Sequence, residues 1–559
     1  MTKSTKRSDA SFLMQGSILA IASIISRIVG LIYRIPLTAT IGKTGNDYYG
    51  TAYEIYNIIL LISSYSIPLA VSKLVSARMA KGHVKDANRV LHGALIFALG
   101  SGGLASAIVF FGAEFFTGQL LKTPLAAIAL KVLAPTLLVV AVLGVFRGFF
   151  QGLGTMIPSA ISQIGEQIVN AIISVVAATI LFSYGKKVGN VLGNEGDYAA
   201  AFGAAGGTLG TATGAAFALL FLLFIFAVFK KVLKKMVKRD KSRQVEDYMS
   251  IFSILFMTII PVLLSTTVYN ISSIIDQAIF KNIASTQGYG AKMISEWWGV
   301  FTGQYKVLIN VPISIASAMA ASTVPSLTAA FYSENHQLVK RQINMANRFV
   351  MVLAFPCAVG MMTLASPIMR LLFNDDDKTS AMMLIVGGVS IIFYSLSTLS
   401  NGVLQGIDKL TVPVKNAIIA LVLHVLLLLV LLEVFKLNIF AVIIANAVYA
   451  LLMCILNQLS VYRFAKSNMD IRLVFLAPLE ASIVMGLVVF FSYKLVDSLT
   501  AMALSARLSN GIATLIAILL GIISYFIALL LFKGVDEETL MRFPGGSRLV
   551  NLAVKLHLM

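Results

Sequence analysis

Two arginines lie seven residues apart in the first long apolar stretch of the chain, SRIVGLIYRIP (26–36). Seven residues make almost two helical turns, so Arg27 and Arg34 would leave the same face of a helix about 10 Å apart. A charge in membrane hydrocarbon costs at least ~2.5 kcal/mol, so such residues usually serve a function. Guanidinium groups offer paired donors that match phosphate oxygens. The spacing therefore predicts a polar cavity that binds an anionic group, with a pyrophosphate as the best fit.

A third basic residue, Lys306, lies within another apolar stretch, GQYKVLINVPISIA (303–316). We expect Lys306 to join Arg27 and Arg34 in one cationic, substrate-binding cavity. Simpler interpretations stay open for Arg34. It is near enough to the outer membrane surface to extend its side chain there, and Glu54 could neutralise it.

Three carboxylates within apolar stretches, Asp276, Glu54 and Glu166, are candidates for ion coupling or for charge pairing. Burial would raise the affinity of a carboxylate for a proton, which makes Asp276 the first candidate for a coupling site. For Arg147 and Lys131, which lie near the ends of their stretches, anchoring at the membrane surface is the simpler interpretation.

The composition is that of a membrane protein. Of 559 residues, 58% are hydrophobic and 12% are charged, about half the charged fraction of a soluble protein. Runs of about 20 apolar residues match the thickness of the hydrocarbon layer. We therefore predict an all-α polytopic membrane protein with fourteen transmembrane helices, near 12–37, 48–76, 90–112, 125–149, 157–183, 201–229, 250–280, 297–330, 347–367, 380–404, 412–434, 438–462, 473–494 and 509–532.

The net charge of +19 reflects topology and not nucleic-acid binding. Alternating the loops across the membrane places most of the 44 Lys and Arg on the side of the N-terminus. The positive-inside rule then places both termini in the cytoplasm, with a short basic tail before a retained first helix. The basic run KKVLKKMVKRDKSR (230–243) is expected to contact anionic lipids.

Two stretches recur at matching points in the two halves of the chain. FRGFFQGLGTMIPSAISQ (146–163) resembles SNGVLQGIDKLTVPVKNA (400–417), and DANRVLHGALIFA (86–98) resembles NMANRFVMVLAFP (344–356). Each half holds six predicted spans, an even number, so the copies are parallel repeats with the substrate site between them. The predicted domains are an N-lobe (1–229), a basic linker (230–249), a C-lobe (250–466) and two further helices with a tail (467–559).

Other motifs give weaker evidence about function. Glycines in GAAGGTLGTATG (203–214) have the spacing that lets helices approach closely, which favours packing within their own bundle over dimerisation. IGKTG (41–45) lacks the first glycine of a phosphate-binding loop. Neither Cys357, Cys454 nor His424 belongs to a metal-ligand pattern. We expect no catalytic residues, metal, cofactor or ATP-binding domain, and a cycle driven by H⁺, Na⁺ or the membrane potential.

Three stretches carry a resemblance to a known family: SRIVGLIYRIPL, RGFFQGLGTMIPSAISQIGEQIVN and INVPISIASAMAASTVPSL. The sequence resembles the multidrug/oligosaccharidyl-lipid/polysaccharide (MOP) exporter superfamily over essentially its whole length. It is most similar to the polysaccharide-transport branch, which includes MurJ-type flippases and proteins related to YtgP and stage V sporulation protein B. The resemblance implies a MATE/MurJ-like fold and a cavity lined by Arg27, Arg34 and Lys306. It also implies a groove for a lipid tail at the last two helices.

The expected function is therefore that of a flippase in the bacterial plasma membrane, acting as a monomer by alternating access. Its expected substrate is an undecaprenyl-pyrophosphate-linked oligosaccharide, with lipid II preferred. Alternatives are an exporter of another polysaccharide or teichoic-type precursor, a cation-coupled multidrug exporter, or a scaffold without transport activity.

Overall fold

The structure is a computed structural model that describes residues 21–64, 66–240, 242, 246–502 and 504–535. All regular elements in these residues are helices, as the composition predicts. They form two compact units, one ending at Gly303 and the other beginning at Gln304. The predicted N-terminal tail, the first part of the first span and most of the C-terminal tail lie outside the described residues.

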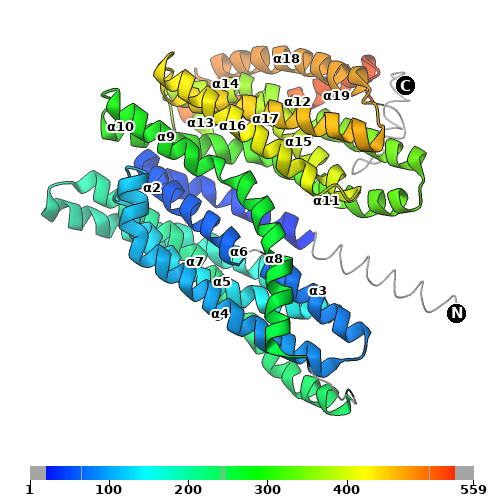
Figure 1. The fold of residues 1–559 in the computed structure, drawn as a ribbon. Coiled ribbons are helices and arrows are strands. Elements are labelled where there is room, and N and C mark those ends of the chain that lie inside the picture. Colours follow the sequence, from blue (N-terminus) through cyan, green and yellow to red (C-terminus); the bar gives the residue numbers. More distant parts are fainter. Residues whose placement is uncertain (1–20, 65, 241, 243–245, 503, 536–559) are drawn as a thin grey trace. The chain divides into compact units, whose positions relative to one another are not determined.

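The first unit is built around α5, which contacts α2, α3, α4 and α7 (Figure 1). Leu130, Leu133 and Leu137 of α5 are fully buried in its core. The helices of this unit are Ile21–Ile32, α2 (Arg34–Ser63), α3 (Ile67–Ala80), α4 (Val84–Glu114), α5 (Ala126–Gly152), α6 (Ile157–Leu192), α7 (Glu195–Arg239), α8 (Tyr248–Asn270), α9 (Ser272–Thr286) and α10 (Ala291–Val300); the π-helical turn η1 (Phe115–Leu120) continues α4, and η2 (Phe301–Tyr305) follows α10.

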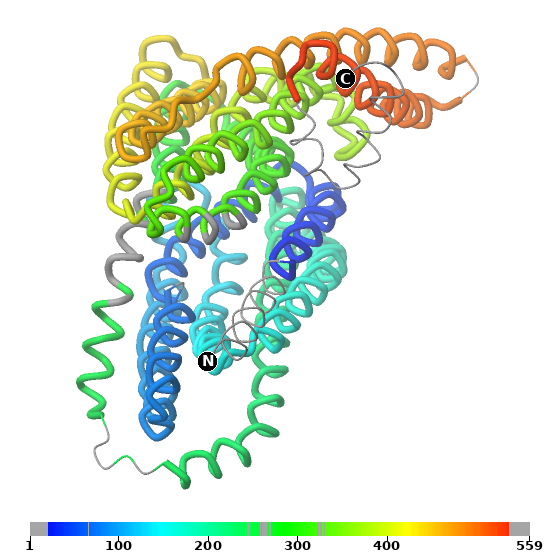
Figure 2. Tube along the Cα trace, turned by 90° about the vertical axis from the view of Figure 1, so that its right-hand side faces the viewer, coloured from blue at the N-terminus to red at the C-terminus, as the bar shows by residue number. Residues whose placement is uncertain are grey.

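The long helices α6 and α7 pack side by side through their glycines (Figure 2). A Cβ on Gly210 would lie 2.1 Å from Ser174 Oγ and 2.7 Å from the carbonyl oxygen of Asn170. A Cβ on Gly206 would lie 2.5 Å from the backbone of Ala177. The predicted role of these glycines in packing within their own bundle is thus confirmed, because only hydrogen fits between the two backbones.

The short loop predicted between the first two spans is a kink inside α2. Gly42 has φ of +70° and ψ of −176°, which are not helical values, and the helix continues on either side. A side chain at this backbone angle would be strained, so glycine suits the bend.

In the second unit, α15 contacts α11, α12 and α17, and α18 packs against α19 and α12. The α18–α19 pair is drawn in orange and red in Figure 1. The helices are α11 (Lys306–Tyr332), α12 (His336–Thr363), α13 (Ala365–Phe373), α14 (Lys378–Gly387), α15 (Ser390–Gly406), α16 (Thr411–Glu433), α17 (Asn438–Ala465), α18 (Ala477–Thr500) and α19 (Ala506–Leu531), with the π-helical turn η3 (Arg472–Leu476) before α18.

The Gln-Gly pairs of the recurring stretches 146–163 and 400–417 end helices in the two units. Gly152 is the last residue of α5 and Gly406 the last of α15, and the next helices begin with Pro158 and Pro413 in their first turns. Each glycine lies against a neighbouring helix, Gly152 on Val75 of α3 and Gly406 on Leu327 of α11.

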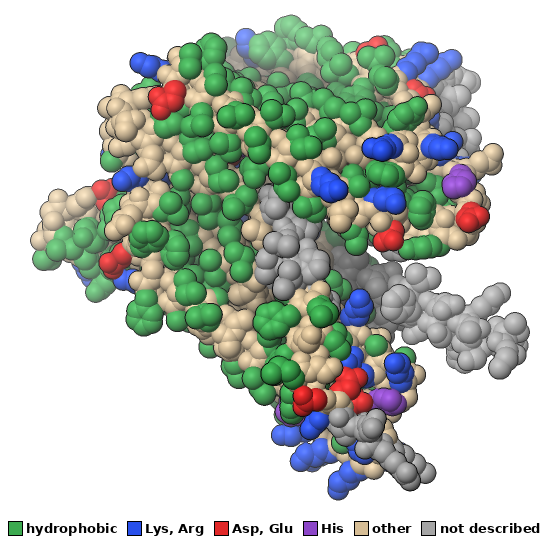
Figure 3. Space-filling model, viewed as in Figure 1, with side chains coloured by type: hydrophobic (Ala, Val, Ile, Leu, Met, Phe, Trp, Pro, Cys, Tyr) green, Lys and Arg blue, Asp and Glu red, His purple; other side chains and the backbone are tan. Residues whose placement is uncertain are grey.

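The protein is a polytopic membrane protein. Among the described residues, ten helices are long and apolar enough to cross a membrane, or eleven if α14 and α15, bent by 43°, form one span. Large apolar side chains such as Phe111, Leu220 and Phe224 are exposed, and apolar surface is widespread in Figure 3. The predicted spans 12–37, 250–280 and 297–330 each include residues whose backbone or side chains are not described, so the number fourteen stays a prediction.

Replacing Gly210 with valine should force α6 and α7 apart and lower the free energy of unfolding by about 1–3 kcal/mol, the usual effect of overpacking. The thermal unfolding midpoint of the purified protein measures this. Gly103→Val in α4 is the matched control, because a Cβ there meets no atom within 4 Å. Equal midpoints for the two variants would contradict the close packing.

The two ends of α7 should lie on opposite sides of the membrane. In a protein lacking Cys357 and Cys454, an impermeant thiol reagent should label Asn194→Cys in intact cells. Lys238→Cys should react only after permeabilisation. Both native positions are exposed, so access to the reagent reports topology and not burial. Labelling of both from outside would refute the predicted topology.

Candidate functional site

Arg27 lies on the surface of the first unit, in the helix Ile21–Ile32. The side of this helix that faces α6 is polar. Ser26 is buried and its hydroxyl donates to the carbonyl oxygen of Gln163 (3.4 Å), and Ser23 Oγ lies 3.4 Å from Gln163 Oε1. These contacts anchor the helix on α6 and leave the Arg27 side chain exposed.

Arg34 begins α2 and packs on aromatic rings. Its guanidinium carbon lies 4.7 Å from the ring centroid of Tyr49 and 5.6 Å from that of Tyr53. The two tyrosine rings are stacked, with centroids 5.5 Å apart and planes 15° from parallel. A guanidinium on an aromatic face gains a cation–π attraction that is strongest where water is excluded. The tyrosines therefore hold Arg34 within the first unit.

A polar seam lies next to Arg34 between α6 and α7. Asn170 donates to the Tyr33 hydroxyl (3.4 Å) and accepts from Ser174 (2.9 Å) and Thr211 (3.5 Å). Since these side chains satisfy one another, the seam can remain buried without water.

Glu166 forms an ion pair with Arg147. Arg147 Nη2 lies 2.7 Å from Glu166 Oε2, and its Nε donates to Ser162 Oγ at 3.0 Å. Both charged side chains are half-buried, so this pair joins α5 to α6 inside the unit. Lys131, for which the sequence favoured an interfacial position, lies 2.7 Å from the exposed Glu114.

The most deeply buried charges escaped the sequence analysis. Lys281 of α9 and Asp47 of α2 are 2% and 0% exposed, and Lys281 Nζ lies 2.5 Å from Asp47 Oδ1. Lys281 also donates to Thr123 Oγ1 (2.6 Å), and Asp47 accepts from Ser295 (2.7 Å). The two residues lie at the edges of predicted spans, where a charge usually faces water. Their opposite charges at the ends of two apolar runs were the signal available in the sequence.

The structure also places the other residues that the sequence predicted for the site. Asp276 is 2% exposed in α9, one turn before Lys281, and Glu54 is half-buried in α2. Lys306 is half-buried and begins α11, directly after the π-helical turn η2. Irregular π turns often mark functional positions in helices. Arg27 and Arg34 belong to the first unit and Lys306 to the second, so their joint site stays a prediction.

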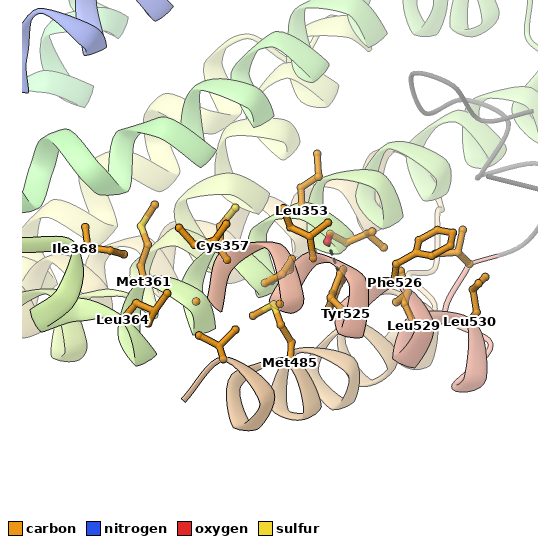
Figure 4. A pocket seen from close by; sticks show the side chains of 18 residues that line it. Leu353, Cys357, Met361, Leu364, Ile368, Met485, Tyr525, Phe526, Leu529 and Leu530 are labelled. Carbon is orange, nitrogen blue, oxygen red and sulfur yellow. Dashed lines mark hydrogen bonds between the residues drawn. The ribbon is translucent and has the colours of Figure 1, made fainter. Parts of the chain in front are cut away.

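An apolar cavity of about 490 Å³ lies within the second unit, between α12, α13, α18 and α19 (Figure 4). Tyr525 closes part of it by donating to the carbonyl oxygen of Val352 at 2.8 Å. Side chains such as Leu353, Met361, Met485 and Phe526 line it. Such a cavity can accommodate a hydrocarbon chain. Within the described residues, no three of His, Cys, Asp and Glu come together as metal ligands.

The sequence profile of the polysaccharide biosynthesis protein family matches residues 12–331, more than half of the chain. The chain belongs to this family. A second profile, MatE, matches residues 307–430. Members of the wider MOP superfamily are transporters and not enzymes, so this family member is a transporter.

Two curated relatives are from Bacillus subtilis (strain 168). Lipid II flippase MurJ is 26% identical over 430 residues, which cover 75% of this chain and 77% of the relative. Stage V sporulation protein B is 29% identical over 159 residues, 28% of this chain and 30% of the relative.

Solved structures share the fold. A lipid II flippase MurJ in an inward closed conformation superposes with a TM-score of 0.64 at 17% identity, covering 94% of this chain and 99% of its own. An inward-facing multidrug resistance MATE family transporter of the MOP superfamily gives a TM-score of 0.62 at 16% identity, covering 79% and 96%. The MATE/MurJ-like fold predicted from the sequence is thus confirmed.

Replacing Lys281 with methionine should leave Asp47 charged and buried without its cation. Breaking a buried pair in this way costs about 3–5 kcal/mol, and removing both charges restores much of that loss. The thermal midpoint should therefore fall in Lys281→Met and recover in Lys281→Met/Asp47→Asn. Lys292→Met, at an exposed lysine of α10, is the control and should change little. A double variant less stable than the single one would show that the pair is not the source of the effect.

Proposed function

We propose that the protein moves an undecaprenyl-pyrophosphate-linked glycan, with lipid II as its substrate, from the inner to the outer leaflet of the bacterial plasma membrane. The observation that carries this proposal is the similarity to lipid II flippase MurJ, which extends over three quarters of the chain. No bond forms or breaks in this process.

The proposed transporter has fourteen spans, both termini in the cytoplasm and a monomeric state. The N-lobe (1–229) and the C-lobe (250–466) rock around a central cavity, connected by the linker 230–249, and residues 467–559 are added to the second lobe. The matching helix ends at Gly152 and Gly406 support a duplication.

In this proposal Arg27, Arg34 and Lys306 bind the pyrophosphate. The Arg27 side chain is exposed in its own unit, as a residue that must reach a substrate should be. Tyr49 and Tyr53 orient the guanidinium of Arg34, so less side-chain freedom is lost when an anion binds. Lys306 would contribute a point charge.

The polyprenyl tail would occupy the apolar cavity between α12, α18 and α19. Its lining is almost entirely hydrocarbon, and a volume of about 490 Å³ accepts only part of a long chain, so the rest would remain in the bilayer. A coupling cation, H⁺ or Na⁺, or the membrane potential would drive the cycle. Asp276, Glu54 and Glu166 are the candidate coupling residues, and Glu166 pairs with Arg147 at 2.7 Å.

An exporter of another lipid-linked polysaccharide precursor is the second candidate, because the family is that of polysaccharide biosynthesis proteins. Both substrates share the pyrophosphate and the polyprenyl tail. Binding of labelled lipid II to the purified protein, together with the precursor that accumulates on depletion, separates the two. A multidrug exporter for cations would need an acidic cavity, whereas Arg27 and Arg34 are basic.

Substitution of Arg27 tests the anion site. Arg27→Ala should abolish complementation of a flippase-depleted strain at normal membrane abundance, because the exposed guanidinium contributes to binding and not to packing. Arg27→Lys should recover only part of the activity, since it restores the charge without the paired donors. Lys306→Arg should be tolerated.

If Arg27 instead has a structural role, the opposite result is expected. Arg27→Ala would then lower protein abundance or the thermal midpoint, and Arg27→Leu would restore both. Full growth on Arg27→Leu at normal abundance would refute the anion site.

A further inference from the structure

The helices α2, α9 and α10 meet within the first unit, and the ion pair of Lys281 and Asp47 lies at this meeting point (Figure 1). Lys281 Nζ lies 2.5 Å from Asp47 Oδ1 and donates to Thr123 Oγ1 at 2.6 Å. Asp47 also accepts from Thr51 at 3.2 Å and from Ser295 at 2.7 Å. All five side chains are buried. The ammonium group is thus held by oxygen atoms, which are also the ligands that bind hard cations in proteins.

Gln277 extends this network and has one oxygen without a donor. It lies one turn before Lys281 on the same face of α9, and its Nε2 donates to Thr51 Oγ1 at 2.5 Å. Its Oε1 is buried and has no hydrogen-bond partner among the described residues. A buried acceptor without a donor costs about 1–3 kcal/mol, and a cation bound beside it would recover that cost. These residues form an oxygen cluster: Asp47, Thr51, Thr123, Gln277 and Ser295.

The charge balance of the ion pair determines which cation the oxygen cluster suits. A buried lysine can lose its proton, unlike an arginine, because a buried charge is costly. Neutral Lys281 would leave Asp47 as an uncompensated buried carboxylate, which costs several kcal/mol. A cation with a single charge restores neutrality, whereas a divalent cation would leave one positive charge in excess.

The backbone around the oxygen cluster is irregular at two points. The kink of α2 at Gly42 lies five residues before Asp47. Interrupted helices form the cation sites of many secondary transporters. Thr123 lies in the turn between η1 and α5, directly after the exposed Lys122. Opening of this turn would admit an ion to the position of the ammonium group.

Neighbouring charges favour a cation at this position. Glu54 attracts Lys281 electrostatically, and the hydroxyl group of Tyr48 is within electrostatic range of Asp47. Lys122 and Lys292 are exposed, so water screens their charges. The charged side chains within two helical turns of the oxygen cluster along the chain, apart from Lys281, are Lys43, Glu54, Lys122, Asp276, Lys292 and Glu296.

We propose that the oxygen cluster binds one monovalent cation such as Na⁺ in exchange for the proton carried by Lys281. On binding, the ammonium group releases one proton to water and remains as a neutral amine, so the net charge of the site does not change. Cation binding does not depend on the transported substrate, because the oxygen cluster includes neither Arg27, Arg34 nor Lys306. Its role as the coupling site of the transport cycle rests on the proposed function.

Calorimetric titration of the purified full-length protein with NaCl, against choline chloride at equal ionic strength and without lipid, tests the exchange. The affinity for Na⁺ should rise about tenfold per pH unit while Lys281 is mostly protonated, because the proton competes with the ion. Buffers of different ionisation enthalpy should report one proton released per ion bound. Asp47→Asn should abolish both effects. Absence of Na⁺ binding, an affinity independent of pH, or binding retained in Asp47→Asn would overturn the proposal.

Removal of the lysine side chain tests the position of the ion. Lys281→Ala leaves space beside Asp47, so Na⁺ should raise its thermal midpoint by about 2 °C or more relative to choline. Lys281→Met is the matched control, because its side chain fills that space, and it should not respond. Equal responses of these two variants would contradict the site. A larger shift with Mg²⁺ than with Na⁺ would refute a monovalent cation.

Gln277→Leu tests the unpartnered oxygen with the ion pair intact, and keeps the proposal testable if Lys281→Ala does not fold. Na⁺ should bind to this variant about tenfold more weakly than to the wild-type protein, because one ligand is lost. Asn190→Leu, at an exposed amide of α6, is the control and should bind Na⁺ as the wild-type protein does. Equal affinities of the two variants would overturn the assigned site. Since no lipid is present, failure of this test leaves the proposed lipid substrate untouched.

Discussion

The constraint on which the structure depends is that charged and polar groups buried among apolar helices must find partners inside the protein. Lys281 and Asp47 show it most clearly, because both are almost completely buried and each has a second, hydroxyl-bearing neighbour. A charge that did not pair in this way would oppose folding by several kcal/mol. The pair joins α2 to α9, and Ser295 extends the network to α10. Helices far apart in the sequence are thus specified as neighbours within the first unit.

The same constraint explains the other polar contacts of this unit. Arg147 and Glu166 join α5 to α6, and Asn170 of α6 contacts the hydroxyls of Tyr33 and of Thr211 in α7. Between these points the helices approach through small residues, as at Gly206 and Gly210, where the backbones of α6 and α7 touch. In lipid, close packing and internal hydrogen bonds replace the hydrophobic drive that assembles soluble proteins. A few polar contacts and a glycine stripe are therefore enough to set the arrangement of long apolar helices.

The apolar cavity of the second unit suits hydrocarbon because of what surrounds it. The cavity of α12, α18 and α19 is bordered by hydrocarbon and a tyrosine whose hydroxyl is occupied. Such a cavity suits an apolar chain whose headgroup is not held at a fixed position.

The sequence by itself determined the class of the protein, because helical membrane spans are set by local runs of apolar residues. The recurrence of the stretches 146–163 and 400–417 was also visible in the sequence, and each stretch contains a helix end, at Gly152 and at Gly406. Arg27 and Arg34 were identified as unusual for the same local reason. Only the tertiary structure decided which groups pair. Arg34 lies on Tyr49 and Tyr53, and Lys281 meets Asp47 across 234 residues of chain. Such partners are chosen by packing between distant helices, and a periodic pattern along one helix carries no information about the face of another.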